Sequence, residues 1–551
     1  MLRSLVVLSL LFMLVVGPAE AVVYVKWDAP GPARDGKSWN TAFLNINDGM
    51  NAANLGEDVW VARGQYNGGG AWQCNRLMGG FAGDPNQPQA RDPELYTTIV
   101  LNGLSVNAFC TLDGLTIQGA TTGVEVGGGN VEIVNCIIQG NTGSTSTDGA
   151  GIRAKLGGLL HIQNCTIRGN SLPRPGFSGG GIYANNCSLV IEDSIIEQNQ
   201  GGIYIQGWTV MRRTKIVGNY GAQIIGTGSA QVEDCQFENN HTDGTGIAMV
   251  FGKCILSRCT FSGNSGAGGM LAAGLITDTL FSGNQGYCLA GGATLVNCTF
   301  AGNQYIANDT CKVSNCVFAF NSGDVSGASS NTYRNCLAWS NGGTQPSWVG
   351  SNGNIAANPL FVNGYHIGSN SPCVDTGYNG AYGVGDIDLD SQPRLLDGNH
   401  DGIQTVDMGA YEYAISLVGA KGIADATIVN PGYTVVTAQF PDRFYVENPT
   451  RSCGIAVTGS GVAVDDVVSV LGTMSSSDGE RMLSPMSILK APYTERIGPL
   501  CMRNAFTGGG PQGAQNGITG ASGLNNIGLL ARTHGYVTAR SLSEYYRILN
   551  R

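Results

Sequence analysis

The sequence predicts an all-β protein in which a right-handed parallel β-helix, a solenoid of stacked coils, is followed by a small C-terminal β-barrel. Three observations predict this fold: a repeated phrase, a composition rich in turn residues, and a change of pattern after residue 413. From residue 131 to 341 the chain repeats apolar-x-apolar-x-polar-small-x-apolar-x-x-Asn ten times, as in LHIQNCTIRGN. A period of about 20 residues with strand-like alternation is typical of a solenoid in which each repeat forms one coil. The ten closing asparagines are Asn141, Asn170, Asn199, Asn219, Asn240, Asn264, Asn284, Asn303, Asn321 and Asn341.

Each repeat predicts two short strands joined by a corner. In LHIQNCTIRGN, Leu160 and Ile162 lie on one side of a strand. Ile167 can join that side only if the chain bends near Asn164, because side chains alternate strictly along a strand. We expect the closing asparagine to form the next corner, since Asn tolerates left-handed backbone geometry, and stacked coils would then carry a ladder of hydrogen-bonded Asn amides. Right-handed crossovers are the strong default for parallel strands, so the helix is expected to be right-handed.

Seven of the sixteen cysteines occupy one slot of the repeat, five residues before the closing asparagine. Coils stack ~4.8 Å apart, so equal slots form a column of side chains. One interpretation is a stack of free, buried thiols, because Ser194, Thr214 and Thr279 replace Cys in the other copies and Cys also packs as a small apolar residue. The alternative is at least one disulfide between neighbouring coils. The cysteines of this slot are Cys136, Cys165, Cys235, Cys259, Cys298, Cys316 and Cys336.

The ends and the composition predict an exported protein. Residues 1–21 have the features of a cleaved signal peptide, with Arg3, a short apolar stretch and the small-x-small sequence Ala19-Glu20-Ala21. No later run is long and apolar enough for a transmembrane segment. The net charge of −10 disfavours nucleic acid as a partner, because phosphate contacts need clustered Lys and Arg. An acidic polysaccharide would need a local basic stripe, and the repeats show only scattered Arg and Lys.

The chain is predicted to contain four parts after the signal peptide. Residues 22–95 form an N-terminal cap, with a helix-like spacing of apolar residues at 43, 46, 50 and 53, and a first coil. Residues 96–413 form the β-helix and its closing segment, and residues 414–500 form the barrel. Residues 501–551 form a linker and a partial second barrel repeat, because VTA and RFYV at 436–446 recur as VTA and EYYR at 537–547. Either the natural product is truncated, which we favour, or this half completes the first barrel.

Several motifs resemble a known family. YVKWDAPGPARDGKSWNTAF, EDVWVARGQY, the coils ending in GN, NPLFVN, SPCVDTG and VDMGAYEY resemble bacterial secreted right-handed parallel β-helix proteins that carry a choice-of-anchor Q domain. The resemblance covers roughly residues 22–413. Residues 420–490 resemble the small OB-like β-barrel modules appended to bacterial exported proteins. The resemblance implies a secreted or cell-surface bacterial protein, from a group in which few activities are assigned.

A polysaccharide lyase would need acidic residues and a basic residue on one face of the coils. Asp193 and Asp234 occupy one repeat slot two coils apart, with Arg213 in the coil between them. The two acids would lie ~10 Å apart, too far to share one ion. The same slot holds Asn in most other repeats, so hydrogen bonding at a corner explains these residues equally well, and we favour that explanation. The sequence motifs of polygalacturonases are absent, and a pectate-lyase pattern is not convincing.

The segment DGNHDGIQTVD predicts a calcium site. Asp397, Asn399, Asp401 and Asp407 supply oxygen ligands around the turn residue Gly402. The usual acid at the twelfth position is missing, because Met408 stands there. The alternative is a polar turn without an ion.

We expect an exported protein that binds or scaffolds glycans or cell-envelope polymers without catalysis. The alternative is a polysaccharide lyase or another carbohydrate-active enzyme of the pectate-lyase-like fold. Tyr183, Tyr204 and Trp208 are candidate exposed aromatics for sugar stacking, although we favour ordinary surface and core-edge positions for them. Function is expected in the irregular loops at 141–151 and 170–181 or in the modules that follow the coils. The sequence indicates neither a ligand nor an oligomeric state.

Overall fold

The computed structural model describes residues 22–549, apart from residues 73–75, 108, 145–147, 174–178, 222–223, 227, 243–248, 267–269, 287, 289–291, 307–311, 326–331, 382–386, 504–505, 521, 534–535 and 541–545. The predicted signal peptide at residues 1–21 therefore lies outside the described residues. The chain forms two compact units, Met1–Val210 with Thr214–Gly228 and Met211–Arg213 with Ser229–Arg551. No helix among the described residues has the length and hydrophobicity needed to cross a bilayer.

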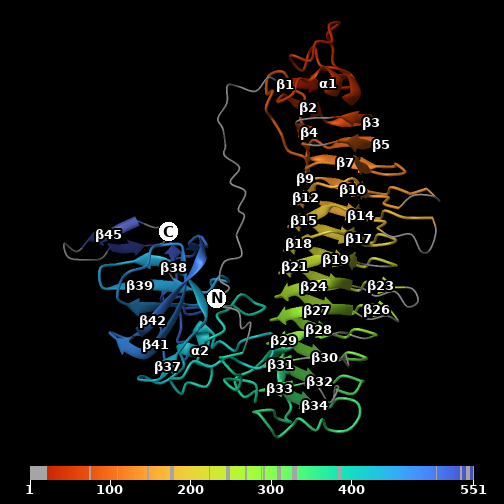
Figure 1. Ribbon diagram of the computed structural model, residues 1–551. Coiled ribbons are helices and arrows are strands. Elements are labelled where there is room, and N and C mark those ends of the chain that lie inside the picture. Colours follow the sequence, from red (N-terminus) through yellow and green to blue (C-terminus); the bar gives the residue numbers. More distant parts are fainter. Residues whose placement is uncertain are drawn as a thin grey trace. The chain divides into compact units, whose positions relative to one another are not determined.

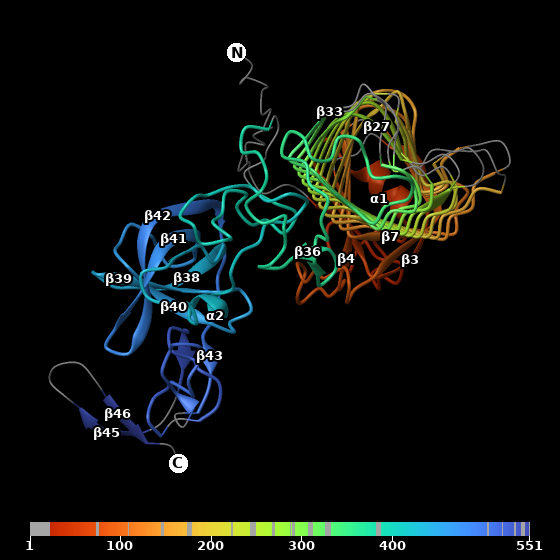
Figure 2. The same ribbon diagram turned by 90° about the horizontal axis from the view of Figure 1, so that it is seen from below.

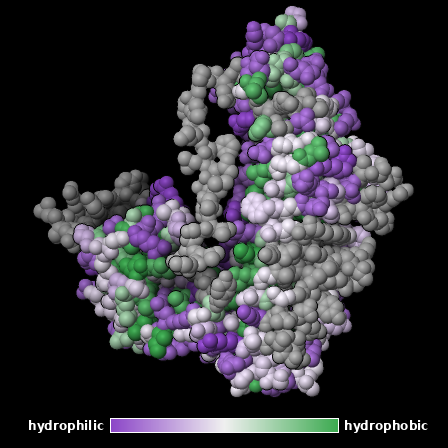
Figure 3. Space-filling view, viewed as in Figure 1, coloured by the Kyte–Doolittle hydropathy of each residue, from purple (hydrophilic) through white to green (hydrophobic). Residues whose placement is uncertain are grey.

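Both units contain coils of a right-handed parallel β-helix, in which each coil adds strands to parallel stacks (Figures 1 and 2). The first stack holds the strand before the predicted corner, the second stack holds the strand after it, and the third stack closes the coil. The register is in phase, since Ile162 pairs with Ile133 in one neighbouring coil and Ile191 in the other. Equal slots of the repeat therefore lie above one another, with apolar residues inside and hydrophilic residues, purple in Figure 3, on the outer faces.

In the first unit, the helix α1 (Ile46–Ala52) carries the predicted apolar spacing and buries Ile46 and Met50. The first stack contains β1 (Val22–Val25), β2 (Asp58–Ala62), β4 (Arg76–Phe81), β6 (Cys110–Asp113), β9 (Val131–Val134), β12 (Leu159–Gln163) and β15 (Ser188–Glu192). The second contains β3 (Gly64–Trp72), β5 (Thr98–Val106), β7 (Leu115–Gln118), β10 (Ile137–Gln139), β13 (Thr166–Arg168), β16 (Ile195–Glu197) and β19 (Lys215–Val217). The third contains β8 (Val124–Val126), β11 (Ile152–Ala154), β14 (Ile182–Asn185), β17 (Ile203–Gln206) and β20 (Ile224–Gly226).

The second unit continues the same pattern, and β18 (Thr209–Arg212) spans the division between the units. Its first stack contains β21 (Ser229–Glu233), β24 (Met249–Ser257), β27 (Met270–Thr277), β29 (Thr294–Val296), β31 (Lys312–Ser314) and β33 (Thr332–Arg334). Its second stack contains β22 (Gln236–Glu238), β25 (Thr260–Ser262), β28 (Leu280–Ser282), β30 (Thr299–Ala301), β32 (Val317–Ala319) and β34 (Leu337–Trp339). The short pairs are β23 (His241–Thr242) with β26 (Ser265–Gly266) and β35 (Phe361–Val362) with β36 (His366–Ile367).

The corner between the first and second stacks confirms the predicted bend. Its residue adopts the left-handed conformation in all ten repeats, with φ between +47° and +56°. This geometry suits Asn and Asp, whose short side chains bond locally, and costs more for a long side chain such as Arg. We call these ten positions the corner column: Asn135, Asn164, Asp193, Arg213, Asp234, Arg258, Asp278, Asn297, Asn315 and Asn335.

The closing asparagines form the predicted ladder, but the expectation that they adopt left-handed geometry is wrong. The left-handed residue is the one before them, usually Gly, as at Gly169 and Gly283. Gly meets that conformation without a steric cost, so the Asn that follows can point its amide inward. In the first unit the Asn170 Nδ2 atom donates to the Asn199 Oδ1 atom at 3.0 Å and to the Ile138 carbonyl at 3.0 Å. The second unit repeats this arrangement from Asn240 to Asn341.

The interior of the coils is filled by columns of the same or similar residues. All seven cysteines of the repeat slot are buried free thiols, which confirms the thiol stack. Burial raises the pKa of Cys136 and of Cys259, as expected for thiols that only pack. Cys110, outside the repeat slot, is disulfide-bonded. In the second unit five phenylalanines stack with ring centroids 4.5–5.1 Å apart: Phe237, Phe261, Phe281, Phe300 and Phe318.

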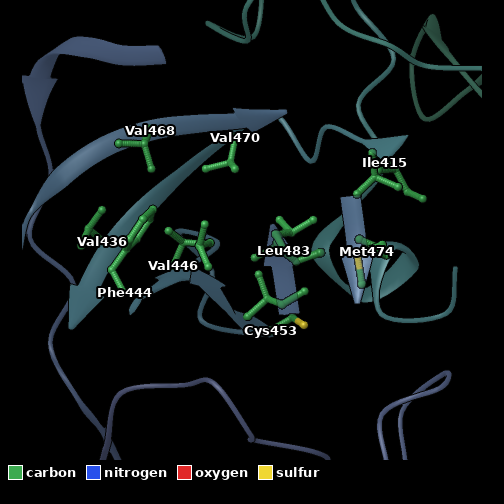
Figure 4. Packing of buried hydrophobic residues seen from close by; sticks show 14 of the residues in the cluster. Ile415, Val436, Phe444, Val446, Cys453, Val468, Val470, Met474 and Leu483 are labelled. Atoms are coloured by element: carbon green, nitrogen blue, oxygen red, sulfur yellow. The ribbon is translucent and has the colours of Figure 1, made fainter. Parts of the chain in front are cut away.

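A closed five-stranded barrel follows the coils in the second unit. Its strands pair in the order β38 (Tyr433–Gln439), β39 (Arg443–Glu447), β40 (Gly454–Thr458), β42 (Glu480–Thr494) and β41 (Asp466–Ser477), and β41 returns to β38. All these pairs are antiparallel except β40 with β42. Phe444, Val446, Val468 and Leu483 point into its core together with Ile415 from the segment before the barrel (Figure 4).

Smaller elements flank the barrel. The helix α2 (Leu417–Ala420) and β37 (Ile428–Val429) precede it, and β43 (Leu500–Cys501) pairs with β44 (Ala531–Arg532) after it. The last strands, β45 (Tyr536–Arg540) and β46 (Tyr546–Leu549), form an antiparallel pair. Their register shifts between residues 537 and 539, as the β38–β39 pair shifts between residues 436 and 438. The shift thus falls at matching positions of the sequence repeat, although Val436 pairs with Val446 while Val537 pairs with Ile548, one position further along than the repeat gives. A partial second barrel repeat stays a prediction.

Candidate functional site

The three catalytic candidates from the sequence all lie in the corner column. Asp193 belongs to the first unit, whereas Arg213 and Asp234 belong to the second. Asp234 accepts two hydrogen bonds, from the Arg258 Nε atom at 2.7 Å and the Nη2 atom at 3.0 Å. Arg258 is the corner residue of the next coil, and its hydrogen bond with Asp234 raises its pKa. This pairing favours corner hydrogen bonding for Asp234, and catalysis by the three residues stays a hypothesis.

The closing segment, residues 358–413, docks onto the corner column through a fully buried arginine. Arg394 donates to Asp278 at 2.9 Å and to Glu412 at 2.9 Å, and these three side chains are only 0–1% exposed. Its remaining donors bond the carbonyls of residues 409 and 410. A guanidinium is a suitable partner for buried carboxylates because its donors reach several acceptors at once. The corner residue Asp278 thus anchors a segment more than a hundred positions later in the chain.

A second contact places Tyr378 against the coils. The Tyr378 amide donates to the Asn315 Oδ1 atom at 2.7 Å, and the Asn315 Nδ2 atom donates back to the Tyr378 carbonyl at 3.2 Å. In the next coil the Asn335 Nδ2 atom donates to the Thr376 carbonyl at 2.8 Å. The left-handed corners thus present their amides to the backbone of the closing segment, which fixes the position of the Tyr378 ring.

A cavity of about 330 Å³ lies on the first stack of the second unit, over β29, β31 and β33. Its volume is at the lower end of the range typical of small-ligand sites. Hydroxyl, amide and basic side chains line it together with apolar ones: Thr294, Val296, Lys312, Val313, Ser314, Thr332, Tyr333, Arg334 and Asn352. Parallel register brings these residues together, since Lys312 pairs with Thr332 and Ser314 pairs with Arg334. Sequence reasoning missed this site because its residues share no motif, although their repeat slots could have indicated it.

The Arg334 guanidinium at the cavity stacks on the Tyr378 ring, with its Cζ atom 3.3 Å from the ring centroid. A planar guanidinium on an aromatic face is held by cation–π attraction and by stacking. Among the described residues neither Arg334 nor Lys312 forms an ion pair. The cavity therefore carries two positive charges that no described carboxylate neutralises.

The predicted calcium residues are only partly brought together. The buried Asp397 carboxylate accepts the amides of residues 401 and 402 at 3.1 and 3.0 Å. Asn399 and Asp401 cap the same turn, and Gly402 has the left-handed φ of +88° that the sharp turn requires. Asp407 instead accepts the amides of residues 375 and 413. Within the described ranges no group of three or more His, Cys, Asp or Glu side chains is arranged to hold a metal, and calcium stays a prediction.

Burial perturbs the carboxylates around that turn. It raises the pKa of Asp407 to about 7 and the pKa of Asp375 to about 6. The Asp375 Oδ1 atom is buried without a hydrogen-bond partner among the described residues. A bound cation would favour the ionised carboxylates, whereas without one burial keeps their protons on until higher pH.

A histidine between two glutamates lies on the first stack of the first unit. The His161 Nδ1 atom is 3.4 Å from Glu132, and its Nε2 atom is 3.5 Å from Glu192 without the geometry of a hydrogen bond. The hydrogen bond with Glu132 raises the pKa of His161, and the pKa of Glu132 is lowered in return. The sequence contained a signal for this group, because Glu132 and His161 occupy the same slot of consecutive repeats.

The predicted sugar-stacking aromatics differ in exposure. Tyr183 is only 8% exposed, which contradicts an exposed sugar-stacking role and agrees with the core-edge position that we favoured. Its ring stacks on that of Tyr204 at 4.9 Å. A Cβ atom at Gly149 or Gly179 would come within 3.0 Å of the Tyr183 Cβ atom, so the backbone approaches this residue closely. Trp208 is 50% exposed. The two predicted loops at 141–151 and 170–181 are described apart from residues 145–147 and 174–178.

Comparison with known proteins agrees with the coil geometry. A family model described as "Right handed beta helix region" matches residues 96–237 and 206–361. The coils are a right-handed β-helix. No curated protein shows a significant match to the sequence.

Solved structures with similar folds include the pectate lyase Pel9A, with 14% identity and a TM-score of 0.31, covering 71% of this chain and 96% of that one. Another is the PL6 family alginate lyase AlyGC, with 11% identity and a TM-score of 0.34, covering 61% of this chain and 53% of that one. A third is the pectin methylesterase from Aspergillus niger, with 14% identity and a TM-score of 0.23, covering 57% and 90%. The chain thus spans about half of the alginate lyase. Similarity at this level gives no basis for transferring an activity.

Proposed function

We propose that this protein is an exported bacterial β-helix that binds a glycan or cell-envelope polymer without catalysis. The cavity over β29, β31 and β33 is the observation that carries the proposal. It opens on a parallel sheet face whose slots repeat from coil to coil, which suits an extended ligand with a repeating chemical unit. Hydroxyls of Thr294, Ser314 and Thr332 and the amide of Asn352 match the hydrogen-bonding groups of a sugar.

A binding experiment tests this proposal. The mature protein, without residues 1–21, is applied to an array of neutral and acidic glycans, and hits are measured by calorimetry. We expect at least one polymer to bind, with binding weakened by Asn352→Ala at the cavity. The matched control is Asn526→Ala, a polar change in the segment after the barrel. Absence of binding to every glycan class would contradict the proposal.

The proposal extends to residues 1–21, the closing segment and the barrel. The strand order of the barrel, in which the third and fifth strands are the parallel pair, supports an OB-like module. The assignment of the closing segment to the choice-of-anchor Q type rests on its sequence motifs. The signal-like residues 1–21 support export. Fractionation of a bacterial host that expresses the full chain, with residues 1–21 present or deleted, tests the location.

A carbohydrate-active enzyme, such as a polysaccharide lyase, is the second candidate, and His161 is the observation that favours it. An imidazole flanked by Glu132 and Glu192 on an outer sheet face is a potential acid–base group. We would incubate the protein with polyuronates and Ca²⁺ and follow the absorbance of unsaturated products. Activity that His161→Gln or Arg213→Ala abolishes would favour the enzyme over the binding protein.

A further inference from the structure

We infer that the cavity over β29, β31 and β33 binds a carboxylated sugar, so that the ligand of this protein is an acidic glycan. This inference rests on the proposed glycan-binding function and narrows its ligand class. It also departs from the expectation drawn from composition, since basic residues are sparse and scattered in the repeats and the chain carries a net charge of −10.

The charge of the cavity lining is the first argument. Two lining residues, Lys312 and Arg334, are basic, and none of the lining residues is acidic. The two basic residues lie on adjacent strands, because Lys312 pairs with Thr332 and Arg334 follows two positions later. Both residues are exposed, and among the described residues no carboxylate pairs with either. Two unpaired cations beside each other repel, and an anionic ligand removes that repulsion.

The fixed orientation of Arg334 is the second argument. Its guanidinium lies on the Tyr378 ring, and the Tyr378 backbone exchanges two hydrogen bonds with the Asn315 amide. The closing segment therefore holds the planar fork in one orientation before a ligand arrives. A fixed fork loses little entropy on binding, and its paired donors match the two oxygens of a carboxylate.

The neutral lining explains why a sugar, rather than a bare anion, fits the cavity. Thr294, Thr332 and Asn352 offer hydrogen-bonding groups around the cations, and Val296 adds an apolar wall. A sugar ring needs this combination, because its hydroxyls bond to polar groups while its C–H faces pack on apolar ones. The small volume fits a short part of a glycan, and the open sheet face leaves room for the rest.

Calorimetry with a matched pair of ligands tests the inference. Oligomers of galacturonic acid carry a carboxylate on each residue, and their methyl esters keep the same backbone without the charge. We expect the acid to bind at least about tenfold more tightly than the ester, and Arg334→Gln to remove most of that difference, because a charge-assisted bidentate contact is lost. Lys312→Gln should weaken binding of the acid oligomer by about threefold, as expected from the loss of a single exposed charge. The control Lys215→Gln removes an exposed charge of the first unit and should leave binding unchanged.

The outcomes separate this inference from the proposed function. Equal binding of acid and ester would overturn the carboxylate inference while the glycan-binding function stands. Binding of neither ligand, when neutral glycans on the array bind, would also overturn it. Loss of all glycan binding would overturn both. Thermal unfolding of each variant checks folding, and Tyr378→Leu, which keeps the charge but removes the stacking partner, should reduce the preference for the acid without changing the net charge.

Discussion

The β-helix carries two columns of polar residues, the Asn ladder and the corner column, which differ in role. The Asn ladder has the same residue in all ten repeats, whereas the corner column contains Asn, Asp and Arg. In the ladder every amide from Asn141 to Asn321 is buried, and an amide such as Asn170 serves both as donor and as acceptor to the coils next to it, Asn141 and Asn199. Only a side chain with both functions at one length satisfies that geometry.

The corner column demands only left-handed backbone geometry, and its side chains face outward. Variation is therefore possible, and the outward groups bond whatever lies beside them. Asp234 pairs with Arg258 in the next coil, whereas Asp278 and Asn315 bind the closing segment. The comparison teaches that uniform repeats stabilise the solenoid, while departures from the repeat mark the places where other parts of the chain attach.

The largest expected effect is at the attachment point Arg394. Arg394→Met leaves the buried carboxylates of Asp278 and Glu412 without their cation, so we expect the free energy of unfolding to fall by about 3–5 kcal/mol. Denaturant unfolding followed by tryptophan fluorescence measures the change. The matched control is Arg443→Met, whose partner Asp442 is exposed, so its loss should leave the free energy of unfolding nearly unchanged. Equal effects at the two positions would mean that Arg394 does not hold the closing segment.

One substitution made at two positions of the same coil compares the columns directly. Asn170→Gly in the ladder removes the side-chain hydrogen bonds to Asn141 and Asn199 and leaves the buried Asn141 backbone amide without its acceptor, so it should cost about 2–4 kcal/mol. Asn164→Gly at the corner removes one exposed hydrogen bond, and Gly tolerates its φ of +51°, so the loss should stay below about 1 kcal/mol. Urea unfolding of both variants provides the values, and a costlier corner would reverse the distinction between the columns.

The pH dependence of stability probes the closing segment. Burial raises the pKa of Asp407 to about 7, so the folded state keeps a proton that the unfolded chain releases above its ordinary pKa of 3.8. This contribution is complete at pH below 3.8 and is lost as the pH rises toward 7, so stability should decrease over that window. The loss amounts to a few kcal/mol at most, since one pKa unit corresponds to about 1.4 kcal/mol. Urea unfolding at pH 5 and pH 8 should show this decrease, and Asp407→Asn should reduce it.

Calcium binding would stabilise the closing segment and not the repeats, because all its predicted ligands belong to the closing segment. If Asp397, Asn399 and Asp401 bind Ca²⁺, saturating ion at a hundred times its dissociation constant adds about 2.7 kcal/mol of stability. We expect a higher melting temperature with Ca²⁺ than with a chelator, and no difference in Asp401→Ala. An unchanged melting temperature of the native protein would contradict the calcium prediction.

The smallest effect is expected at a partly exposed pair in the middle of the corner column. Arg258→Gln breaks the partly exposed pair with Asp234 and should change the free energy of unfolding by about 1 kcal/mol or less. The salt dependence of unfolding distinguishes a screened surface pair from a buried one. A loss as large as that of Arg394→Met would show that the column is uniformly important to stability.

Sequence reasoning predicted features that depend on short-range patterns, but much of the candidate site depends on contacts between distant segments. The repeat phrase predicted the coils, the bend near Asn164, the buried thiols and the Asn ladder, because these follow from short-range alternation and from stacking of equal slots. It assigned left-handed geometry to the closing asparagine, whereas the preceding residue, such as Gly169, adopts it. Both residues tolerate this conformation, and only the direction of the amide into the core separates them.

The sequence by itself determined the solenoid, since its period and alternation admit few other ways to bury the apolar side chains. Only the tertiary structure decided where the closing segment lies and what it builds. Arg394 meets Asp278, and Tyr378 reaches Arg334, across separations of 116 and 44 residues, which no local pattern specifies. Local hydrogen bonds and side-chain alternation are readable along the chain, whereas contacts between distant segments depend on shape and charge that exist only after folding.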